Sequence, residues 1–579
     1  MNSAKYKDKL YDVREILDLR ELLDSSAKLF ASKNAFLVKD KVAKKFVPIS
    51  YAQFRVDVNA LGTSFMRLGL KGKKIAVIGE NSYQWVVTYL ATTNGTGVIV
   101  PIDRELKTKE ILNLLNRAEV SAVVCSSKLS KTIDEIKDQI DNLEYIIEMD
   151  LSEDIDGKLS FDNLIKEGRI AVSEGDDSFI TAEIDREALC SILFTSGTTG
   201  MAKGVMLSHK NITANVYNMS KYVKIVDDGV GLSVLPMHHS YEMTCHVFTG
   251  LYQGIAIAIC EGLKYIQKNL EEVNATVMLA VPLIFETMHK KIWKQSESQG
   301  KAKKMAKMVK LSKKTKLYNN QKLIRKIFAP IHKSTGNNIH QFIAGGAAIN
   351  PKVIEDYEAM GFPMIQGYGM TENAPIIAVN KDRYSKADSV GMPVPGTDVK
   401  IIGQDETGMG EIIVKGPSVM IGYYNNEEAT AEAIKDGWLY TGDYGYMDDE
   451  GFLYISGRKK NVIVTKNGKN IFPEEVEFYL SESDFIEEVL VHGIVDDRTG
   501  DTVVKAEIYP NYPLIEELRG EIPEEEIREF LKGLIDKIND QMPLYKRVKR
   551  FDIRKEEFEK TTTRKIKRYT EANFGEGDN

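Results

Sequence analysis

Residues 188–204, ALCSILFTSGTTGMAKG, join a short apolar run to a loop rich in glycine and hydroxyl side chains. The apolar half is typical of a buried strand, and the glycines of the loop let the backbone come close to a polyanion. Hydroxyl groups and Lys203 add hydrogen-bond donors and positive charge. The stretch therefore predicts a phosphate-binding loop. It is not the P-loop of NTPases, because no Gly-Lys-Ser/Thr closes it.

Apolar runs that alternate with helix-like segments surround this loop. Between residues 59 and 103 a helical pattern leads to KIAVIG, then to YQWVVTYLA and GTGVIVPID, and the same rhythm returns at 121–127, 276–282 and 340–351. Such alternation is typical of a parallel sheet covered on both faces by helices. We expect an α/β fold with several such subdomains, since 579 residues are too many for one core.

The pattern changes after Val390. The short runs VKIIG, GEIIVKG and GFLYISG, separated by glycine turns, indicate a small β-rich subdomain over about residues 390–456. The charged segment GRKKN at 457–461 is interpreted as a hinge, and the patterns of 462–579 indicate a small α+β domain. We therefore predict an N-terminal domain at 1–456, the hinge, and a C-terminal domain at 462–579.

The composition limits the classes of function. The chain has 77 basic and 84 acidic residues and a net charge of −7, so it lacks the basic field that nonspecific nucleic-acid binding needs. Its four cysteines form no CxxC pair, no signal peptide is apparent, and no apolar run reaches the roughly 20 residues that cross a bilayer. We expect a cytoplasmic protein, monomer or homodimer, that does not bind nucleic acid.

One segment is basic, although the chain as a whole has a negative net charge. Residues 289–333 are rich in lysine, with Met305, Met308, Val309 and Leu311 at roughly helical spacing. Two interpretations stay open: a surface helix that touches anionic lipid, or a solvated helical excursion packed on the domain through one face. Membrane contact is therefore expected to be peripheral at most.

Further motifs follow the phosphate loop in order: GYGMTE at 367–372, YTGD at 440–443, GRKKN at 457–461 and KTTTRKIKR at 560–568. Tyr368 offers an aromatic face for adenine, while Thr371 and Glu372 offer hard oxygens suited to magnesium. Asp443 has acceptor sites for both hydroxyls of a ribose. Each motif alone is also compatible with a structural turn.

In their order and spacing, these motifs resemble those of the adenylate-forming superfamily, which includes acyl-CoA synthetases, firefly-type luciferases and peptide-synthetase adenylation domains. In the overall pattern of its sequence, the chain is most similar to bacterial long-chain fatty acid–CoA ligases. The resemblance implies ATP, Mg²⁺ and CoA as reactants, activation of a fatty acid as its acyl-AMP, and a mobile C-terminal domain that serves both half-reactions.

The same resemblance implies a role for each matching residue. Thr195 and Glu372 would bind magnesium, and Lys203 and Lys565 would join them in catalysis, Lys565 by bridging the carboxylate and the α-phosphate. The nucleotide and CoA would be held by Ser196, Gly197, Thr198, Thr199, Gly200, Gly345, Gly346, Ala347, Gly367, Tyr368, Gly369, Thr371, Asp443, Arg458, Lys460 and Gly468. His239 and Tyr241 would lie at the entrance to the acyl pocket.

Alternative functions stay open. The acyl group would pass to CoA or to the phosphopantetheine arm of an acyl carrier protein, and both acceptors end in the same thiol. A noncatalytic nucleotide- or acyl-binding protein would be favoured by loss of Lys203, Glu372, Asp443 or Lys565, but all four are present. The histidines of residues 235–246 match no zinc pattern. The length of the acid depends on apolar side chains from distant segments.

Overall fold

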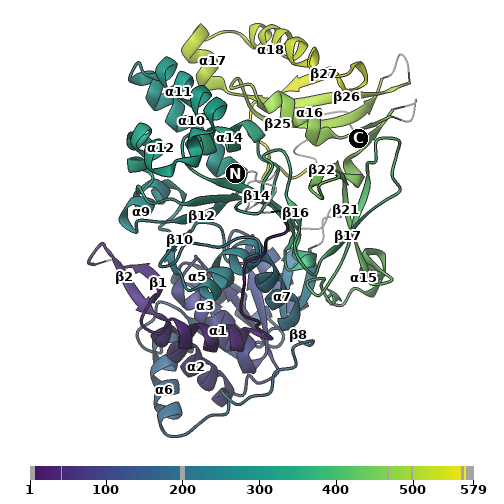
Figure 1. Cartoon of the computed structure of the whole chain (residues 1–579). Coiled ribbons are helices and arrows are strands. Elements are labelled where there is room, and N and C mark those ends of the chain that lie inside the picture. Colours follow the sequence, from purple (N-terminus) through teal and green to yellow (C-terminus); the bar gives the residue numbers. More distant parts are fainter. Residues whose placement is uncertain are drawn as a thin grey trace. The chain divides into compact units, whose positions relative to one another are not determined.

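The computed structural model describes residues 7–40, 42–195, 202–465, 469–496, 500–561 and 566–568 (Figure 1). The chain forms two compact units. Unit 1 contains the chain up to Val399, together with Val414–Leu439 and Gly451–Leu453. Unit 2 contains Lys400–Ile413, Tyr440–Glu450 and the chain from Tyr454 onward. Unit 2 thus takes in part of the β-rich region, and the domain boundaries at 456 and 461 stay a prediction.

The phosphate-loop stretch lies in a mixed sheet with the strand order β19-β9-β8-β4-β3-β5-β6-β7. Strands β4, β3, β5, β6 and β7 pair in parallel, whereas β8 and β9 form an antiparallel hairpin on which β19 pairs. The central parallel strands are almost wholly buried and apolar, as strands covered on both faces must be. The bounds are β3 Lys74–Ile78, β4 Val98–Ile102, β5 Ala122–Cys125, β6 Tyr145–Glu148, β7 Lys158–Ser160, β8 Leu189–Thr195, β9 Lys203–Ser208 and β19 Gly422–Tyr423.

A second sheet of unit 1 has the order β16-β15-β14-β13-β12-β10-β11-β1-β2. Its strands from β14 to β1 pair in parallel, and antiparallel strands close both edges. The predicted α/β class is therefore confirmed. The bounds are β1 Asn34–Lys39, β2 Phe46–Ser50, β10 Val230–Ser233, β11 Ala256–Ile259, β12 Val277–Ala280, β13 Gln341–Ala344, β14 Met364–Gly369, β15 Ile376–Val379 and β16 Met392–Pro393.

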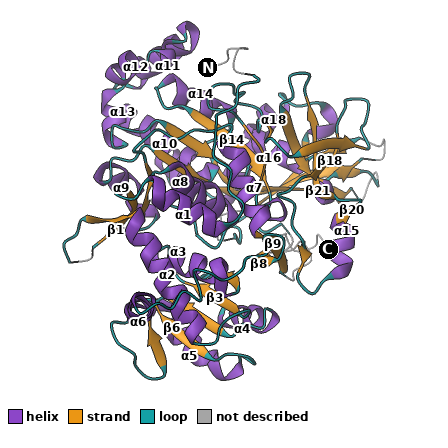
Figure 2. Cartoon of the chain, turned by 60° about the horizontal axis from the view of Figure 1, so that its bottom comes forward, coloured by secondary structure: helices purple, strands orange, loops and turns teal. Residues whose placement is uncertain are grey.

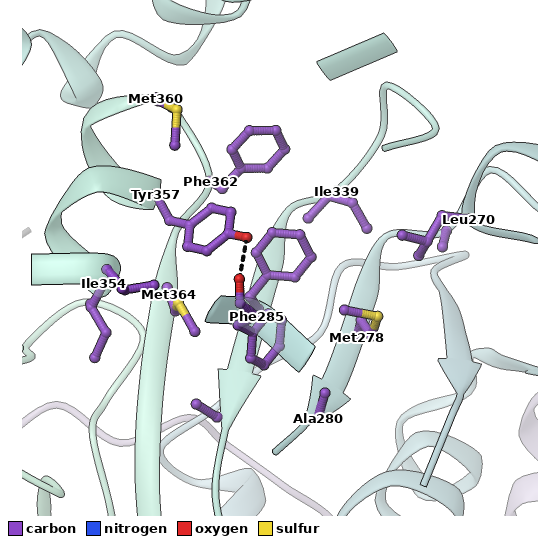
Figure 3. Packing of buried hydrophobic residues seen from close by; sticks show 14 of the residues in the cluster. Leu270, Met278, Ala280, Phe285, Ile339, Ile354, Tyr357, Met360, Phe362 and Met364 are labelled. Carbon is purple, nitrogen blue, oxygen red and sulfur yellow. Dashed lines mark hydrogen bonds between the residues drawn. The ribbon is translucent and has the colours of Figure 1, made fainter. Parts of the chain in front are cut away.

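Helices lie between and beside these strands, as Figure 2 shows. Beside the second sheet, α10 and α14 enclose a cluster of aromatic side chains (Figure 3). In that cluster Tyr357 is fully buried and its hydroxyl donates to the carbonyl of Phe285 at 2.9 Å. The bounds are α1 Leu19–Leu29, α2 Tyr51–Arg67, α3 Tyr83–Ala91, α4 Thr108–Arg117, α5 Ser127–Ile136, α6 Phe161–Ser173, α7 His209–Ser220, the π-helix η4 Tyr241–Phe248, α8 Thr249–Gln253, α9 Ile266–Glu272, α10 Pro282–Ser298, α14 Pro351–Ala359 and α15 Glu427–Ala433.

The lysine-rich segment is helical, with α11 Ala302–Thr315, α12 Gln321–Ile327 and α13 Ala329–Ser334 after α10. Helix α11 packs on α10 and α14 through Met305 and Val309, which are buried. Leu311, by contrast, is 54% exposed and does not belong to the packed face. None of the described helices is long and apolar enough to cross a membrane.

Unit 2 ends in a separate α+β core. Strands β25 Ile486–Val495, β26 Thr502–Pro510 and β27 Val548–Ile553 form its sheet, covered by α16 Pro473–Ser481 and α18 Glu524–Asn539. Helix α18 buries Ile527, Leu531, Ile535 and Ile538, which share one face of a helix. The remaining elements are α17 Tyr512–Arg519, β17 Asp398–Ile402, β18 Gly410–Lys415, β20 Ile434–Lys435, β21 Trp438–Met447, β22 Leu453–Arg458, β23 Ile463–Val464 and β24 Asn470–Ile471.

Replacing glycine by alanine should have opposite effects on stability at two helical positions. A Cβ at Gly168 of α6 would lie 1.9 Å from the carbonyl oxygen of Ala60 in α2, whereas a Cβ at Gly533 of α18 would meet nothing within 4 Å. We expect Gly168→Ala to lower the free energy of unfolding of unit 1 by about 1–3 kcal/mol through overpacking. Gly533→Ala should stabilise unit 2 by roughly 0.5–1 kcal/mol. Urea denaturation measures both, and equal effects would contradict this account of α2 and α6.

Candidate active site

The β8–β9 hairpin places the two ends of the phosphate loop next to each other. Thr195 ends β8 and pairs with Lys203 at the start of β9, and the Thr195 hydroxyl donates to the Lys203 carbonyl at 3.4 Å. The loop residues Ser196, Gly197, Thr198, Thr199 and Gly200 lie outside the described residues, as do Gly468 and Lys565. The hairpin fixes where the loop begins and ends.

Tyr423 links this hairpin to Glu372. Its ring lies 4.9 Å from the Lys203 ammonium, and its hydroxyl donates to Glu372 Oε1 at 2.8 Å. Tyr423 belongs to β19, which pairs with β9. The backbone follows the same route, since the amide of Met420 donates to the Glu372 carbonyl at 2.8 Å. A cation, an aromatic ring and a carboxylate therefore meet beside the loop.

Helix α7 holds the loops that carry Glu372 and Tyr423. The buried Asn211 amide donates to the carbonyls of Pro417 and Val419, both at 2.8 Å. One turn later, Asn215 is fully buried, and its side chain binds the backbone of Asn373 and Ile376. Residues four apart share a helix face, so one face of α7 fixes both loops.

The Glu372 carboxylate fits a magnesium ligand. Tyr423 occupies Oε1, and within the described part of the chain no hydrogen bond engages Oε2. The Thr195 hydroxyl adds a second hard oxygen, and β9 lies against the short helix Thr371–Asn373 that carries Glu372. Carboxylate and hydroxyl oxygens are the ligand types that Mg²⁺ prefers.

The GYGMTE segment spans the end of β14. A Cβ on Gly369 would lie 2.1 Å from the Pro375 carbonyl oxygen, so the strand turns here only with glycine. Tyr368 is half-buried and pairs with Ala378 of β15. Thr371 and Glu372 follow in the short helix, half-buried as well. The motif therefore forms a turn whose last residues reach the hairpin.

The segment after β13 lies against Tyr241. A Cβ on Gly345 would come within 2.8 Å of the Tyr241 ring, and the Tyr241 hydroxyl donates to the Ile343 carbonyl at 3.2 Å. Gly346 adopts a φ of 82°, and both Gly346 and Ala347 are exposed. The structure thus brings Gly345, one of the residues predicted to hold the nucleotide or CoA, next to Tyr241, the tyrosine predicted at the acyl entrance.

An apolar cavity of about 20 Å³ lies behind Tyr241. It is bounded by α7, η4, α8 and the strands β12 to β15, and its wall includes Gly367 of the GYGMTE segment. Its other lining residues are Met219, Val223, Ile225, Cys245, Thr249, Gln253, Leu279, Ile343, Ala344, Ile376 and Val379. The volume is close to that of one water molecule.

His239 precedes η4, and its ring centroid lies 4.1 Å from that of His238. Burial, with a smaller contribution from Arg104, lowers the pKa of His238 to about 3, so this imidazole is neutral at physiological pH. Burial also raises the pKa of Tyr241 well above its ordinary value, which keeps its hydroxyl protonated. Tyr241 therefore contributes no charge to the wall of the cavity.

In unit 2, Asp443 and Arg458 form an ion pair on neighbouring strands. Asp443 of β21 is 4% exposed, and its Oδ1 lies 2.8 Å from Arg458 Nε at the end of β22. Arg458 also donates to the Thr441 carbonyl at 3.3 Å. Lys460 is exposed in the following turn. The structure brings the first two residues together, and their ribose contacts stay a prediction.

Arg568 anchors the C-terminal motif KTTTRKIKR to α16. Its guanidinium binds Glu477 and donates to the Val491 carbonyl at 3.1 Å, and Lys560 and Ile566 form a β-bridge. Burial raises the pKa of Glu477 to about 7, against the lowering effect of Arg568. The motif is therefore held at its C-terminal end by a partly buried ion pair.

Sequence reasoning missed Tyr423, Asn211, Asn215 and Arg568. Tyr423 lies in the run IGYYNNEE. The two adjacent tyrosines are conspicuous in the sequence, but the sequence does not indicate what they contact. Asn211 and Asn215 have helical spacing, but an asparagine inside a helix is usually exposed. Only the tertiary contacts reveal that both are buried.

The two parallel-stranded sheets, the glycine-rich hairpin and the carboxylate beside it define a nucleotide-binding α/β enzyme. A family model described as AMP-binding enzyme matches residues 24–424, and the chain belongs to this family. The membership of the adenylate-forming superfamily predicted from its motifs is confirmed.

Known relatives and structures agree with this membership. A long-chain-fatty-acid–CoA ligase of Bacillus subtilis is 29% identical over 502 residues, covering 80% of this chain and 82% of the relative. The ligase of that name from Salmonella typhimurium is 28% identical over 473 residues, covering 75% and 76%. The anthranilate CoA ligase AuaEII in complex with anthranoyl-AMP shares the fold, with a TM-score of 0.74 at 20% identity over 95% of this chain and 96% of that one. ATP-bound MatB from Rhodopseudomonas palustris has a TM-score of 0.72 at 22% identity, with 95% and 97% covered.

Tyr423→Phe tests the link between the hairpin and Glu372. The substitution keeps the ring beside Lys203 and removes the hydroxyl that orients the carboxylate. Because a hydrogen bond to a charged group contributes about 1.5–3 kcal/mol, we expect kcat/KM for ATP to fall at least roughly tenfold. Tyr424→Phe is the matched control, since the Tyr424 hydroxyl binds Glu119 instead. Equal kinetics for the two variants would contradict the role given to Tyr423.

The raised pKa of Glu477 predicts that the stability of unit 2 depends on pH. Its folded pKa of about 7 lies above the ordinary 4.5, so the folded state binds the proton more tightly than the unfolded chain. Stability should therefore fall as pH rises from about 4.5 to 7. Glu477→Gln should remove this slope. Glu529→Gln, at an exposed position of α18, should keep it. Urea denaturation at several pH values tests this, and an unchanged slope in Glu477→Gln would refute it.

Proposed function

We propose that this enzyme activates a fatty acid with ATP and transfers the acyl group to CoA. The observation that carries the proposal is the junction of the hairpin with Glu372 through Tyr423, which gathers a phosphate loop, a lysine and a carboxylate in one place. The names of the relatives support a long-chain acid and CoA as the acceptor.

The chemistry explains this combination of residues. In the first step a carboxylate oxygen attacks the α-phosphorus of ATP, the bond to the β-phosphate oxygen breaks, and pyrophosphate leaves. Both reactants are anionic, so positive groups at the phosphates lower the barrier. Lys203 and the hairpin loop supply such groups, and Thr195 and Glu372 would hold the magnesium ion, which neutralises phosphate charge when bound.

In the second step the CoA sulfur attacks the acyl carbonyl carbon. The bond from that carbon to the phosphate oxygen breaks, AMP leaves, and the thiol proton passes to solvent. We assign Lys565, Asp443, Arg458, Lys460 and Gly468 to these steps from the family motifs. We further propose a hinge at 457–461 and a cytoplasmic location.

The apolar cavity behind Tyr241 is the proposed acyl site. Its wall is almost entirely hydrocarbon, which favours an alkyl chain over a polar substrate. At about 20 Å³ it does not hold such a chain until neighbouring side chains rotate. Met219 in the wall is flexible enough to take part in this opening.

Pyrophosphate release tests the function. The assay uses ATP, Mg²⁺ and saturated acids from short to long, each with and without CoA. We expect acid-dependent release that turns over only with CoA, and a loss of at least about 100-fold in Glu372→Gln and Lys565→Ala, because both groups act on transition-state charge. Lys567→Ala, two residues further along, is the matched control for Lys565→Ala.

Other outcomes point to other functions. Release that stops after about one turnover with CoA but continues with a holo acyl carrier protein would favour the carrier protein as acceptor. An absence of release with every acid, while ATP still binds, would leave a noncatalytic nucleotide-binding protein. Full activity in Glu372→Gln would contradict the site described above.

A further inference from the structure

We propose that the outer face of helix α11 docks the enzyme on an anionic lipid bilayer. Residues 289–333 contain 15 Lys or Arg and a single acidic residue, Glu297, in a chain whose net charge is −7. The positive charge is thus concentrated in one segment. Among the described residues, none of 289–333 lines the cavity behind Tyr241, and the carboxylate of Glu372 is hydrogen-bonded to Tyr423 instead, so the active site does not account for this charge.

Four of the six lysines of α11 lie on one side of the helix. Lys303, Lys307, Lys310 and Lys314 form what we call the basic stripe, and all four are exposed. At 3.6 residues per turn they fall within about 60° of arc, opposite the face that packs on α10 and α14. In both views α11 lies outside α10 and α14 (Figures 1 and 2). The stripe therefore points away from the protein.

The stripe carries an electrostatic cost that the fold does not relieve. Its members are spaced three or four residues apart, where like charges repel and destabilise a helix. The first turn of α11 contains no acidic residue, although Lys303 and Lys304 stand at the positive end of the helix dipole. Lys313, on the inner side, is the lysine of α11 with ion-pair partners among the described residues, Glu355 and Asp356. A partner rich in negative charge would relieve the repulsion.

Two features favour a bilayer among such partners. The stripe consists of lysine, a point charge suited to diffuse attraction, and contains none of the arginine that recognises phosphate in a bidentate way. Leu311 stands 54% exposed beside it, flanked along the helix by Lys307 and Lys314. An exposed leucine among lysines suits the boundary between lipid headgroups and acyl chains. The proposal does not depend on the proposed function, although a bilayer is where long-chain acids collect.

Vesicle flotation tests the proposal with the full-length enzyme. Each lysine near an anionic surface contributes about a fivefold factor to partitioning, so the stripe as a whole should contribute at least about 100-fold. We expect binding to phosphatidylcholine vesicles that contain phosphatidylglycerol, loss of binding at high salt, and little binding to pure phosphatidylcholine. The variant Lys303→Gln/Lys307→Gln/Lys310→Gln/Lys314→Gln should lose the binding, and Leu311→Ser should weaken it.

The matched control is Lys71→Gln/Lys109→Gln/Lys131→Gln/Lys166→Gln. These lysines are exposed elsewhere on unit 1, and the control changes the net charge by the same amount. Arginine at the four stripe positions should keep the vesicle binding, which separates charge from misfolding. Activity toward a short, soluble acid should be unchanged in all variants. Equal vesicle binding by stripe and control variants would overturn the proposal, as would binding of an acidic carrier protein or of RNA without vesicle binding.

Discussion

The site depends on two buried asparagine side chains of one helix. Asn211 and Asn215 of α7 satisfy backbone groups in the segments at 417–419 and 373–376. An unpaired buried backbone group costs free energy, and an amide side chain offers both a donor and an acceptor. Helix α7 therefore decides where Glu372 and Tyr423 stand, although it supplies no group to the proposed chemistry.

The electrostatics of the molecule follow from the anionic nature of its proposed reactants. Lys203 and the Glu372 carboxylate contact the same side chain, Tyr423, and the charge of this carboxylate is useful only when a cation joins it. In the wall of the cavity the polarity is the opposite, because burial raises the pKa of Tyr241 and keeps its hydroxyl protonated.

In unit 2, two carboxylates that are removed from solvent are paired with arginine side chains. Asp443 is buried but paired with Arg458, and Glu477 is partly buried and paired with Arg568. A buried carboxylate without a partner would be strongly destabilising. The two pairs hold the ends of segments that the motifs single out, β22 before the proposed hinge and the tail that contains Lys565. Structural ion pairs and proposed functional residues are thus neighbours in the chain.

Local patterns in the sequence were enough for the α/β class and the family, because apolar runs, glycine turns and ordered motifs are properties of short segments. The placement of Glu372 beside Lys203 required the structure, since Tyr423 reaches it from about 50 residues away and pairs with β9 only in the folded sheet. The same holds for Leu311, whose spacing suggested a packed residue but whose side chain is exposed. Periodicity shows which residues share a helix face, whereas the neighbouring helices decide which face is covered.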